Sequence, residues 1–285
     1  MSINDRGYRL GVYEKSMPDS LTMQEKLASA KEAGYDFVEL SVDESDAKIA
    51  RLDWSDAQIA SVLDAGRKAG IRFESICLSA QRKYPLGSAM EGGAETAMRV
   101  LRKAVLLAMK LGIRIVQLQG YDCYYHETSS GRTKENFFRS LRKGAMTAAQ
   151  YGVTLGMETM ENDFLNTVEK AMYYVRQIGS PYLQVYPDVG NLSNATQSVC
   201  RDIRAGAGHI VSAHLKETVP GKFREIPFGS GDVDFPDVIA ALYESGVRRY
   251  VAEFWHDGGE NWKQVMKGNR DFLDRQFEKA FELLA

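Results

Sequence analysis

The chain contains little cysteine. Its three cysteines, Cys77, Cys123 and Cys200, are far apart in the sequence and form no C-x-x-C pair. Because isolated cysteines in odd number suggest neither a disulfide framework nor a zinc knuckle, we expect free thiols in a reducing cytoplasm. The first ten residues, MSINDRGYRL, also lack the basic start and the apolar core of a signal peptide.

An excess of charge of one sign is missing as well. The 36 Lys and Arg residues nearly balance the 38 Asp and Glu residues, which leaves a net charge of −2. The composition therefore gives no sign of a nucleic-acid partner. The longest aliphatic stretch, around Ala104–Met109, is too short to span a membrane. With 44% hydrophobic and 26% charged residues, the chain has the balance of a soluble globular protein with a sizeable core.

No Pro- or Ser-rich linker divides the 285 residues. Instead one pattern recurs, a helical segment with a Gly near its end followed by a short apolar strand, as in Lys31–Leu40 and Met109–Leu118. Gly adopts the left-handed conformation after a helix at low cost, so its recurrence marks helix ends. With an opening strand at Tyr8–Tyr13, the repeats give eight strands, each followed by a helix. This count predicts an α/β fold, a single (β/α)8 TIM barrel over residues 1–285.

One helix can be predicted in detail. Ser55 and Gln58 form a capping-box pattern just before an apolar series. The series consists of Ile59, Val62 and Leu63, which we expect to share one helical face.

Four apolar runs in the second half of the chain each end on a residue able to bind a metal. These runs are Val153–Glu158, Leu183–Asp188, Ile210–His214 and Tyr250–Glu253. Parallel strands in a barrel bring their C-terminal ends to one face, where barrel enzymes build their active sites. Two Glu, an Asp and a His brought together there predict an oxygen-rich pocket for a divalent cation. For any one of these residues alone, a salt bridge at the barrel end is the alternative.

Several longer motifs extend over nearly the whole chain. They are VELSVDESD, ARLDWS and QLQGYD in the first half, and METMEND, YPDVGNLS, SAHLKET, PGKFREIPFGSGDVDF and VAEFW in the second. These motifs resemble the family of 3-epimerases that act on L-ribulose 5-phosphate and L-xylulose 5-phosphate. The resemblance implies a xylose-isomerase-like TIM barrel with one divalent metal ion, for which Zn²⁺ and Mn²⁺ are the favoured candidates. It assigns the metal to Glu158, Asp188, His214 and Glu253.

The resemblance also implies a reaction, the interconversion of L-xylulose 5-phosphate and L-ribulose 5-phosphate in pentose and L-ascorbate catabolism. A proton leaves one face of C3 and another arrives on the opposite face. A metal that chelates O2 and O3 would act as a Lewis acid and stabilise a cis-enediolate. The family implies that Glu158 and Glu253 exchange acid and base roles, whereas the sequence alone gives only the pair.

Barrels often bind phosphate after strands 7 and 8. Here that region carries Lys216, Lys222 and Arg224 near glycines whose backbone amides could approach an anion. We predict that these residues bind the substrate phosphate; a solvated basic loop is the alternative. Asn191 stands where related free-ketose epimerases have a His, so contacts to the substrate hydroxyls should differ.

Polar residues at the ends of strands 2 to 4 are further candidates for binding substrate hydroxyls. They are Glu39, Ser41, Glu74 and Gln119. Polar packing at the barrel mouth would explain them almost as well.

Three other functions remain open for such a barrel. A ketose–aldose isomerase uses similar metal chemistry. A phosphodiesterase like endonuclease IV needs further metal ligands, which Cys77, Ser79, Gln119 and Asn191 do not supply. A non-catalytic sugar-binding protein would not need the acid pair. We therefore predict a cytoplasmic isomerase that binds a small sugar phosphate, has no nucleic-acid or membrane partner, and forms a homodimer, the commonest symmetric assembly.

Overall fold

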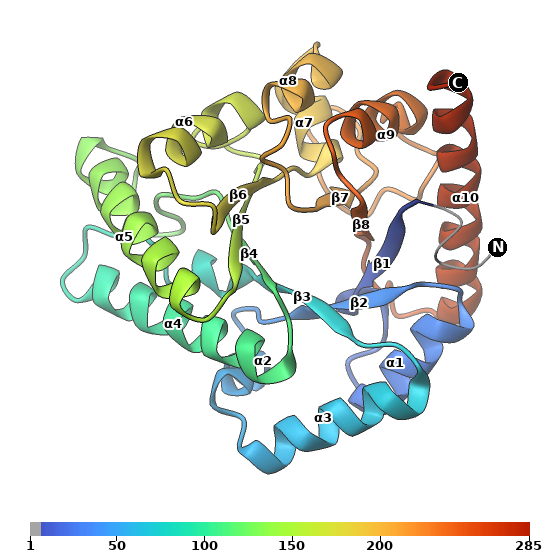
Figure 1. The fold of residues 1–285 in the computed structure, drawn as a ribbon, viewed down its shortest axis with the longest axis horizontal. Helices are drawn as coiled ribbons and strands as arrows, with labels where there is room; N and C mark the ends of the chain where they lie inside the picture. Colours follow the sequence, from blue (N-terminus) through green and yellow to red (C-terminus); the bar gives the residue numbers. More distant parts are fainter. Residues whose placement is uncertain (1–6) are drawn as a thin grey trace.

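A computed structural model describes residues 7–285 of the chain. Eight parallel strands lie at the centre of the molecule, and the helices surround them (Figure 1). The strands are β1 (Arg9–Tyr13), β2 (Phe37–Ser41), β3 (Phe73–Leu78), β4 (Ile115–Leu118), β5 (Thr154–Glu158), β6 (Leu183–Tyr186), β7 (Ala213–Leu215) and β8 (Arg249–Ala252). The predicted (β/α)8 barrel is confirmed.

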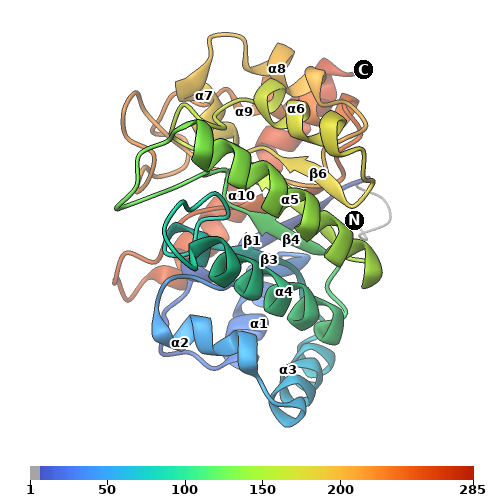
Figure 2. The same cartoon turned by 90° about the vertical axis from the view of Figure 1, so that its left-hand side faces the viewer.

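The helices form the outer layer, which Figure 2 shows from the side of α4 and α5. They are α1 (Met23–Glu32), α2 (Asp46–Ile49), α3 (Asp56–Ala69), α4 (Gly93–Leu111), α5 (Gly131–Gln150), α6 (Val168–Ile178), α7 (Val189–Ala195), α8 (Val199–Ala205), α9 (Phe235–Glu244) and α10 (Trp262–Leu283). Three 3-10 turns follow a strand or short helix, η1 (Glu14–Ser16), η2 (Ala50–Asp53) and η3 (Ser79–Arg82). Within the described part of the chain, no helix is long and apolar enough to cross a membrane.

The sheet is closed nearly all the way round. The hydrogen-bonded order is β6-β5-β4-β3-β2-β1-β8-β7, so β6 and β7 form its two edges. Two isolated parallel bridges join these edges, Val185 with Ile210 and Asp188 with His214. The least paired seam of the barrel therefore runs beside two of the predicted metal ligands.

Strand alternation divides the core into two layers. Val38 and Leu40 of β2 point outward and belong to the large core between the sheet and the helices. A smaller cluster inside the barrel consists of Tyr13, Phe37, Cys77 and Val251. The interior is tightly packed, because a Cβ atom added to Gly11 would lie 2.4 Å from the Phe37 ring.

The sequence pattern predicted the ends of α3 well. Ser55 and Gln58 form the expected capping box, and Gly70 ends the helix with a φ of 65°. Val62 is buried. Leu63, at the edge of the same face, is 42% exposed. Its side chain lies in an open groove, where no neighbouring helix covers it.

Candidate metal centre and active site

The four residues at the strand ends lie together in the structure. Each of Glu158, Asp188, His214 and Glu253 offers one ligand atom, and these atoms lie within 4.8 Å of one another. Glu158 is the last residue of β5, His214 lies in β7, and Asp188 and Glu253 follow β6 and β8. All four side chains are buried. Among residues 7–285 they are the only such group of three or more.

The pocket formed by these residues is strongly negative. His214 Nδ1 lies 2.7 Å from Glu158 Oε1 and 3.5 Å from Glu253 Oε2. Burial lowers the pKa of His214, but the neighbouring glutamates, Glu253 foremost, raise it well above its ordinary value. Burial raises the pKa of Asp188, Lys216 lowers it and Glu253 raises it, with the result at about 6. A divalent cation would balance the charge of the carboxylates and displace the proton from His214.

Glu253 fits the role of a metal ligand. Its Oε2 atom is buried and accepts no hydrogen bond from the described residues, which is unfavourable for a carboxylate oxygen unless another group binds it. The nearest cationic atoms, His214 Nδ1 at 3.5 Å and Lys216 Nζ at 3.7 Å, lie beyond hydrogen-bond distance. Three carboxylates and one imidazole form a donor set suited to Zn²⁺ or Mn²⁺. The residues present therefore fit a divalent metal.

Glu158 is held by two side-chain amides. Its Oε2 atom accepts hydrogen bonds from Gln117 and from Gln119 Nε2, the latter at 2.7 Å. The backbone N–H of Gln119 donates to Gln81 Oε1 at 2.9 Å. Gln119 Oε1 has no hydrogen-bond partner among the described residues, and Gln119 lines the cavity above the metal centre. Gln119 therefore lies in the cavity, and its contact with a substrate stays a prediction.

A cavity opens above the metal centre at the C-terminal ends of the strands. Every strand except β2 contributes to it, directly or through the segment that follows. Glu158 and Glu253 line this cavity, whereas Asp188 and His214 lie beneath it with no exposed surface. The two glutamates are thus the metal-centre residues that face the space for a substrate.

Two basic residues that the sequence patterns did not single out also line the cavity, Lys15 and Arg82. The Arg82 guanidinium lies 5.9 Å from the ring centroids of Tyr121 and Tyr124, and Lys15 forms an ion pair with Asp43. Both follow a strand directly, in η1 and η3. That position after a strand is the one signal in the sequence that could have identified them.

The three predicted phosphate contacts occupy different positions. Lys216 is buried in the metal centre, where it forms an ion pair with Asp188. Arg224 lines the cavity, and its guanidinium lies 5.4 Å from the ring centroid of Trp255. Lys222 is exposed on a turn and does not line the cavity. The structure therefore brings Lys216 and Arg224 to the site but not Lys222.

Backbone amides of the loop after β7 do bind an anionic group, but that group is Glu217. Its carboxylate accepts hydrogen bonds from the N–H groups of Gly229 at 2.9 Å, Val233 at 3.1 Å and Thr218 at 3.2 Å. The N–H of Gly221 donates to Asn194 at 2.9 Å. The N–H groups of Gly221 and Gly229 are therefore already bonded within the protein, and an approach of these two amides to a phosphate would require those bonds to break.

Asn191 lines the cavity, yet both ends of its amide already have partners. Its Nδ2 donates to the Thr159 carbonyl at 2.8 Å, and its Oδ1 accepts from Lys216 Nζ at 2.9 Å. Glu39, another predicted substrate contact, does not line the cavity and lies under His214. Asn191 therefore orients Lys216 in this structure, and Glu39 touches the imidazole.

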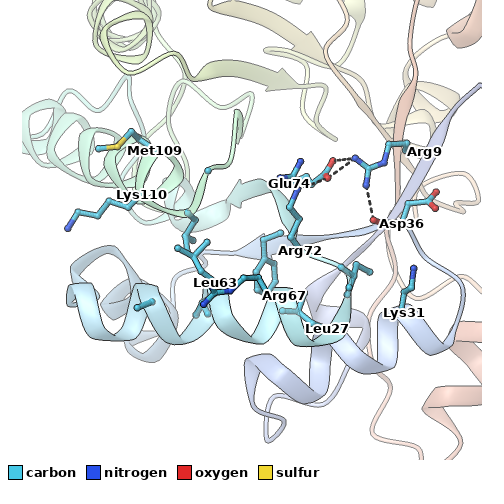
Figure 3. A pocket seen from close by; sticks show the side chains of 18 residues that line it. Arg9, Leu27, Lys31, Asp36, Leu63, Arg67, Arg72, Glu74, Met109 and Lys110 are labelled. Carbon is cyan, nitrogen blue, oxygen red and sulfur yellow. Dashed lines mark hydrogen bonds and ion pairs between the residues drawn. The ribbon is translucent and has the colours of Figure 1, made fainter. Parts of the chain in front are cut away.

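A second groove lies at the opposite end of the barrel (Figure 3). Residues of α1, α3 and α4 line it, together with Glu74 near the start of β3. Glu74 accepts hydrogen bonds from Arg9 at 2.6 and 2.7 Å and from Arg72 at 3.0 Å. The prediction that Glu74 binds substrate is wrong, because it lies at the N-terminal end of its strand and is paired with arginines. No metal-binding group lies in this groove among the described residues.

Comparison with known proteins agrees with the fold. A family model described as a xylose isomerase-like TIM barrel matches residues 27–276. The L-ribulose-5-phosphate 3-epimerase UlaE of Salmonella paratyphi A is 40% identical over 272 residues, which cover 95% of each chain. Among solved structures, D-psicose 3-epimerase from Clostridium cellulolyticum H10 superimposes with a TM-score of 0.79 at 17% identity, covering 94% of this chain and 99% of that one. An L-ribulose 3-epimerase superimposes with a TM-score of 0.76 at 23% identity, covering 97% of both chains.

The two solved structures share the fold with this chain, and the curated relative shares sequence over nearly its whole length. The chain belongs to the xylose isomerase-like TIM barrel family and, within it, to the group that contains the L-ribulose-5-phosphate 3-epimerases, as its sequence motifs predicted.

Proposed function

We propose that this protein is a metal-dependent 3-epimerase that interconverts L-xylulose 5-phosphate and L-ribulose 5-phosphate. Relatives that are 40% identical to this chain are named L-ribulose-5-phosphate 3-epimerases, which supports this choice of substrate. The proposal depends most on one observation, that only two of the four candidate metal ligands face the cavity. Glu158 and Glu253 line the substrate cavity, whereas Asp188 and His214 are buried beneath it.

Inversion at C3 needs a base on one face of the carbon and an acid on the other. Glu158 ends β5 and Glu253 follows β8, and β6 and β7 separate these two strands around the barrel. A carbon bound between the two carboxylates would therefore present a different face to each. One glutamate removes the C3 proton, and the other delivers a proton to the opposite face; the roles exchange when the reaction runs backward.

Neighbouring side chains hold Glu158 in position and lie close to Glu253. Gln117 and Gln119 orient Glu158 through its Oε2 atom, and Lys216 and His214 lie close to Glu253. A divalent cation bound by the four ligands would supply positive charge that stabilises the enediolate left when C3 loses its proton.

We place the phosphate of the substrate beside Lys15, Arg82 and Arg224. These are the basic residues that line the cavity in addition to Lys216, whose ammonium group already pairs with Asp188. Guanidinium groups suit phosphate because they present several donors in a fixed plane. The homodimer, the cytoplasmic location and the role in pentose and L-ascorbate catabolism remain predictions within the same proposal.

Incubation of the metal-loaded protein with L-xylulose 5-phosphate tests the proposal directly. We expect L-ribulose 5-phosphate as the product, identified by NMR, and no conversion by an Asp188→Ala variant. An aldose phosphate as the product would indicate a ketose–aldose isomerase instead. No conversion of either pentulose phosphate by protein with full metal content would contradict the proposal.

A further inference from the structure

The two ring nitrogens of His214 face different surroundings. Nδ1 points into the metal centre, 2.7 Å from Glu158 Oε1 and 3.5 Å from Glu253 Oε2. Nε2 points the other way and lies 2.6 Å from Glu39 Oε1. His214 and Glu39 both have no exposed surface. The imidazole is therefore held between the metal centre on one side and a single buried carboxylate on the other.

Glu39 is itself held in place from two further strands. Its Oε2 atom accepts a hydrogen bond from the Ser75 hydroxyl at 2.6 Å and another from the Tyr186 hydroxyl at 2.9 Å. Ser75 is the register partner of Glu39 on β3, and Tyr186 ends β6. The Tyr186 ring also packs edge-on against the His214 ring, with centroids 4.8 Å apart. Every polar contact of Glu39 thus fixes its position relative to the imidazole.

These contacts determine which tautomer a metal-bound His214 adopts. An ionised carboxylate has no proton to donate, so it accepts the proton of Nε2. A neutral imidazole carries only one N–H, which leaves the lone pair of Nδ1 free for a cation. We propose that Glu39 is a positioning residue of the metal centre, which holds His214 in the orientation and tautomer that bind the metal through Nδ1. This inference rests on the metal centre of the proposed function.

Glu39 thus has a different role from the substrate contact that the sequence suggested. Glu39 lies beneath His214 and is absent from the cavity lining, so a substrate in the cavity meets Glu158 and Glu253 first. Glu39 therefore acts on the reaction through His214, and its removal should change metal binding before it changes substrate binding.

The test uses Glu39→Gln, which keeps the size of the side chain but removes its charge. The amide can rotate and donate to Nε2, which would favour the tautomer with a proton on Nδ1. We expect the affinity for Zn²⁺, measured by competition with a chromophoric chelator, to fall by roughly 10–100-fold. Long-range ¹⁵N–¹H NMR of the Zn²⁺-loaded wild-type protein should show the His214 proton on Nε2. Glu74→Gln is the matched control, since Glu74 is a buried carboxylate bonded to arginines at the other end of the barrel.

A second variant keeps the test decisive if Glu39→Gln does not fold. Ser75→Ala removes one hydrogen bond to Glu39 and leaves its charge, so we expect a smaller fall in Zn²⁺ affinity in the same direction. At saturating metal, the KM for the sugar phosphate should stay near the wild-type value in both variants. Unchanged Zn²⁺ affinity in a folded Glu39→Gln variant, or a raised KM with unchanged Zn²⁺ affinity, would overturn the inference. Failure of the wild-type protein to bind either Zn²⁺ or Mn²⁺ would overturn the proposed function together with it.

Discussion

Single residues of the metal centre differ in how firmly the protein holds them. Asp188 is fixed by its backbone surroundings, because its Oδ1 atom accepts the N–H groups of Gly190 and Asn191 at the start of α7. Asp188 Oδ2 and Glu253 Oε2 are both buried without a hydrogen bond, but Asp188 Oδ2 pairs closely with Lys216, whereas the nearest cationic atom to Glu253 Oε2 lies 3.5 Å away. A residue that already has partners can be oriented before metal binding, whereas an oxygen without one gains the most from a cation.

Replacement of Asp188 or His214 by Ala should abolish metal binding and activity together, because each replacement removes one ligand atom from the pocket. Atomic absorption on the purified variants measures the metal content. His209→Ala is the matched control, since His209 is an exposed histidine just before β7 and should keep full metal content. Full metal content in both Ala variants of the centre would remove these residues from the site.

Arg224→Ala should raise the KM for the phosphorylated ketose by roughly tenfold or more, because a charge-assisted hydrogen bond contributes about 1.5–3 kcal/mol. The KM for the free ketose should change much less. Lys222→Ala serves as the control from the same loop, since Lys222 is exposed and does not line the cavity. Steady-state kinetics with both ketoses would contradict the phosphate assignment if Arg224→Ala affected the two equally.

The sequence indicated the metal residues because each ends an apolar run, and parallel strands bring such ends together. It could not separate Glu39 from Glu74, since both are single acids in apolar strands. Their roles depend on partners from distant parts of the chain, His214 for Glu39 and Arg9 for Glu74. The sequence pattern therefore identified the candidate metal ligands, but it did not identify the residues that hold those ligands in place.

At the scale of the elements, one buried ion cluster ties the loops after β1 and β2 to α1. Glu14 of η1 binds Lys26 of α1 at 2.7 Å and Arg51 of η2 at 2.6 and 2.8 Å. Its Oε2 atom also accepts the backbone N–H of Ser41 at 2.9 Å. Glu14 has no exposed surface. The cluster holds the side of the barrel mouth that carries Lys15 of the cavity.

Glu14→Gln should lower the free energy of unfolding at neutral pH by about 3–5 kcal/mol, because it leaves two buried cations without their partner. Burial raises the pKa of Glu14, but Arg51 and Lys26 lower it more strongly, from 4.5 to about 2. Because the pKa is lower in the folded state, the stabilisation is complete above pH 4.5 and disappears as the pH falls toward 2.

Urea denaturation of wild type and Glu14→Gln across this pH range measures the effect. The difference between the two proteins isolates Glu14, since their other carboxylates titrate alike. Asp64→Asn is the control, because Asp64 is an exposed partner of Lys68 and should have little effect at any pH. A stability difference between wild type and Glu14→Gln that stayed constant from neutral pH to pH 2 would contradict the assigned role.

Element boundaries could be predicted where local chemistry sets them. Gly70, Gly112 and Gly179 end α3, α4 and α6 with left-handed backbone conformations, as the recurring Gly suggested. The exposure of Leu63 could not be predicted, because it depends on how far α4 covers α3. The hydrogen bonds from the loop N–H groups to the Glu217 carboxylate could likewise not be predicted, because they form only when the loop folds back toward the end of β7.

For the whole molecule, we expect metal binding at the seam between β6 and β7 to stabilise the fold. Asp188 and His214 lie on opposite sides of this seam and form one of its two bridges. A cation bound by both would link the edges of the sheet. The predicted single domain over residues 1–285 should then unfold in one transition that depends on the metal.

Added Zn²⁺ should therefore raise the Tm of the wild-type protein. A metal that binds only the folded state adds about 2.7 kcal/mol to the free energy of unfolding when its free concentration is a hundred times Kd. This corresponds to a rise in Tm of several degrees. Differential scanning calorimetry with Zn²⁺ and with a chelator measures the shift. Asp188→Ala should show no such shift, and an equal rise in that variant would place the metal elsewhere.

In the proposed mechanism, Glu158 and Glu253 act on opposite faces of C3. Glu158→Gln and Glu253→Gln each keep one oxygen for the metal but cannot accept the C3 proton, so inversion should fall by roughly 10²–10⁴-fold. NMR in D₂O of the metal-loaded variants, with each pentulose phosphate as substrate, measures both inversion and exchange at C3. We expect each variant to retain exchange for at most one epimer, a different one in each, without inverting it. Near-normal inversion by either variant with its metal bound would contradict the two-base mechanism.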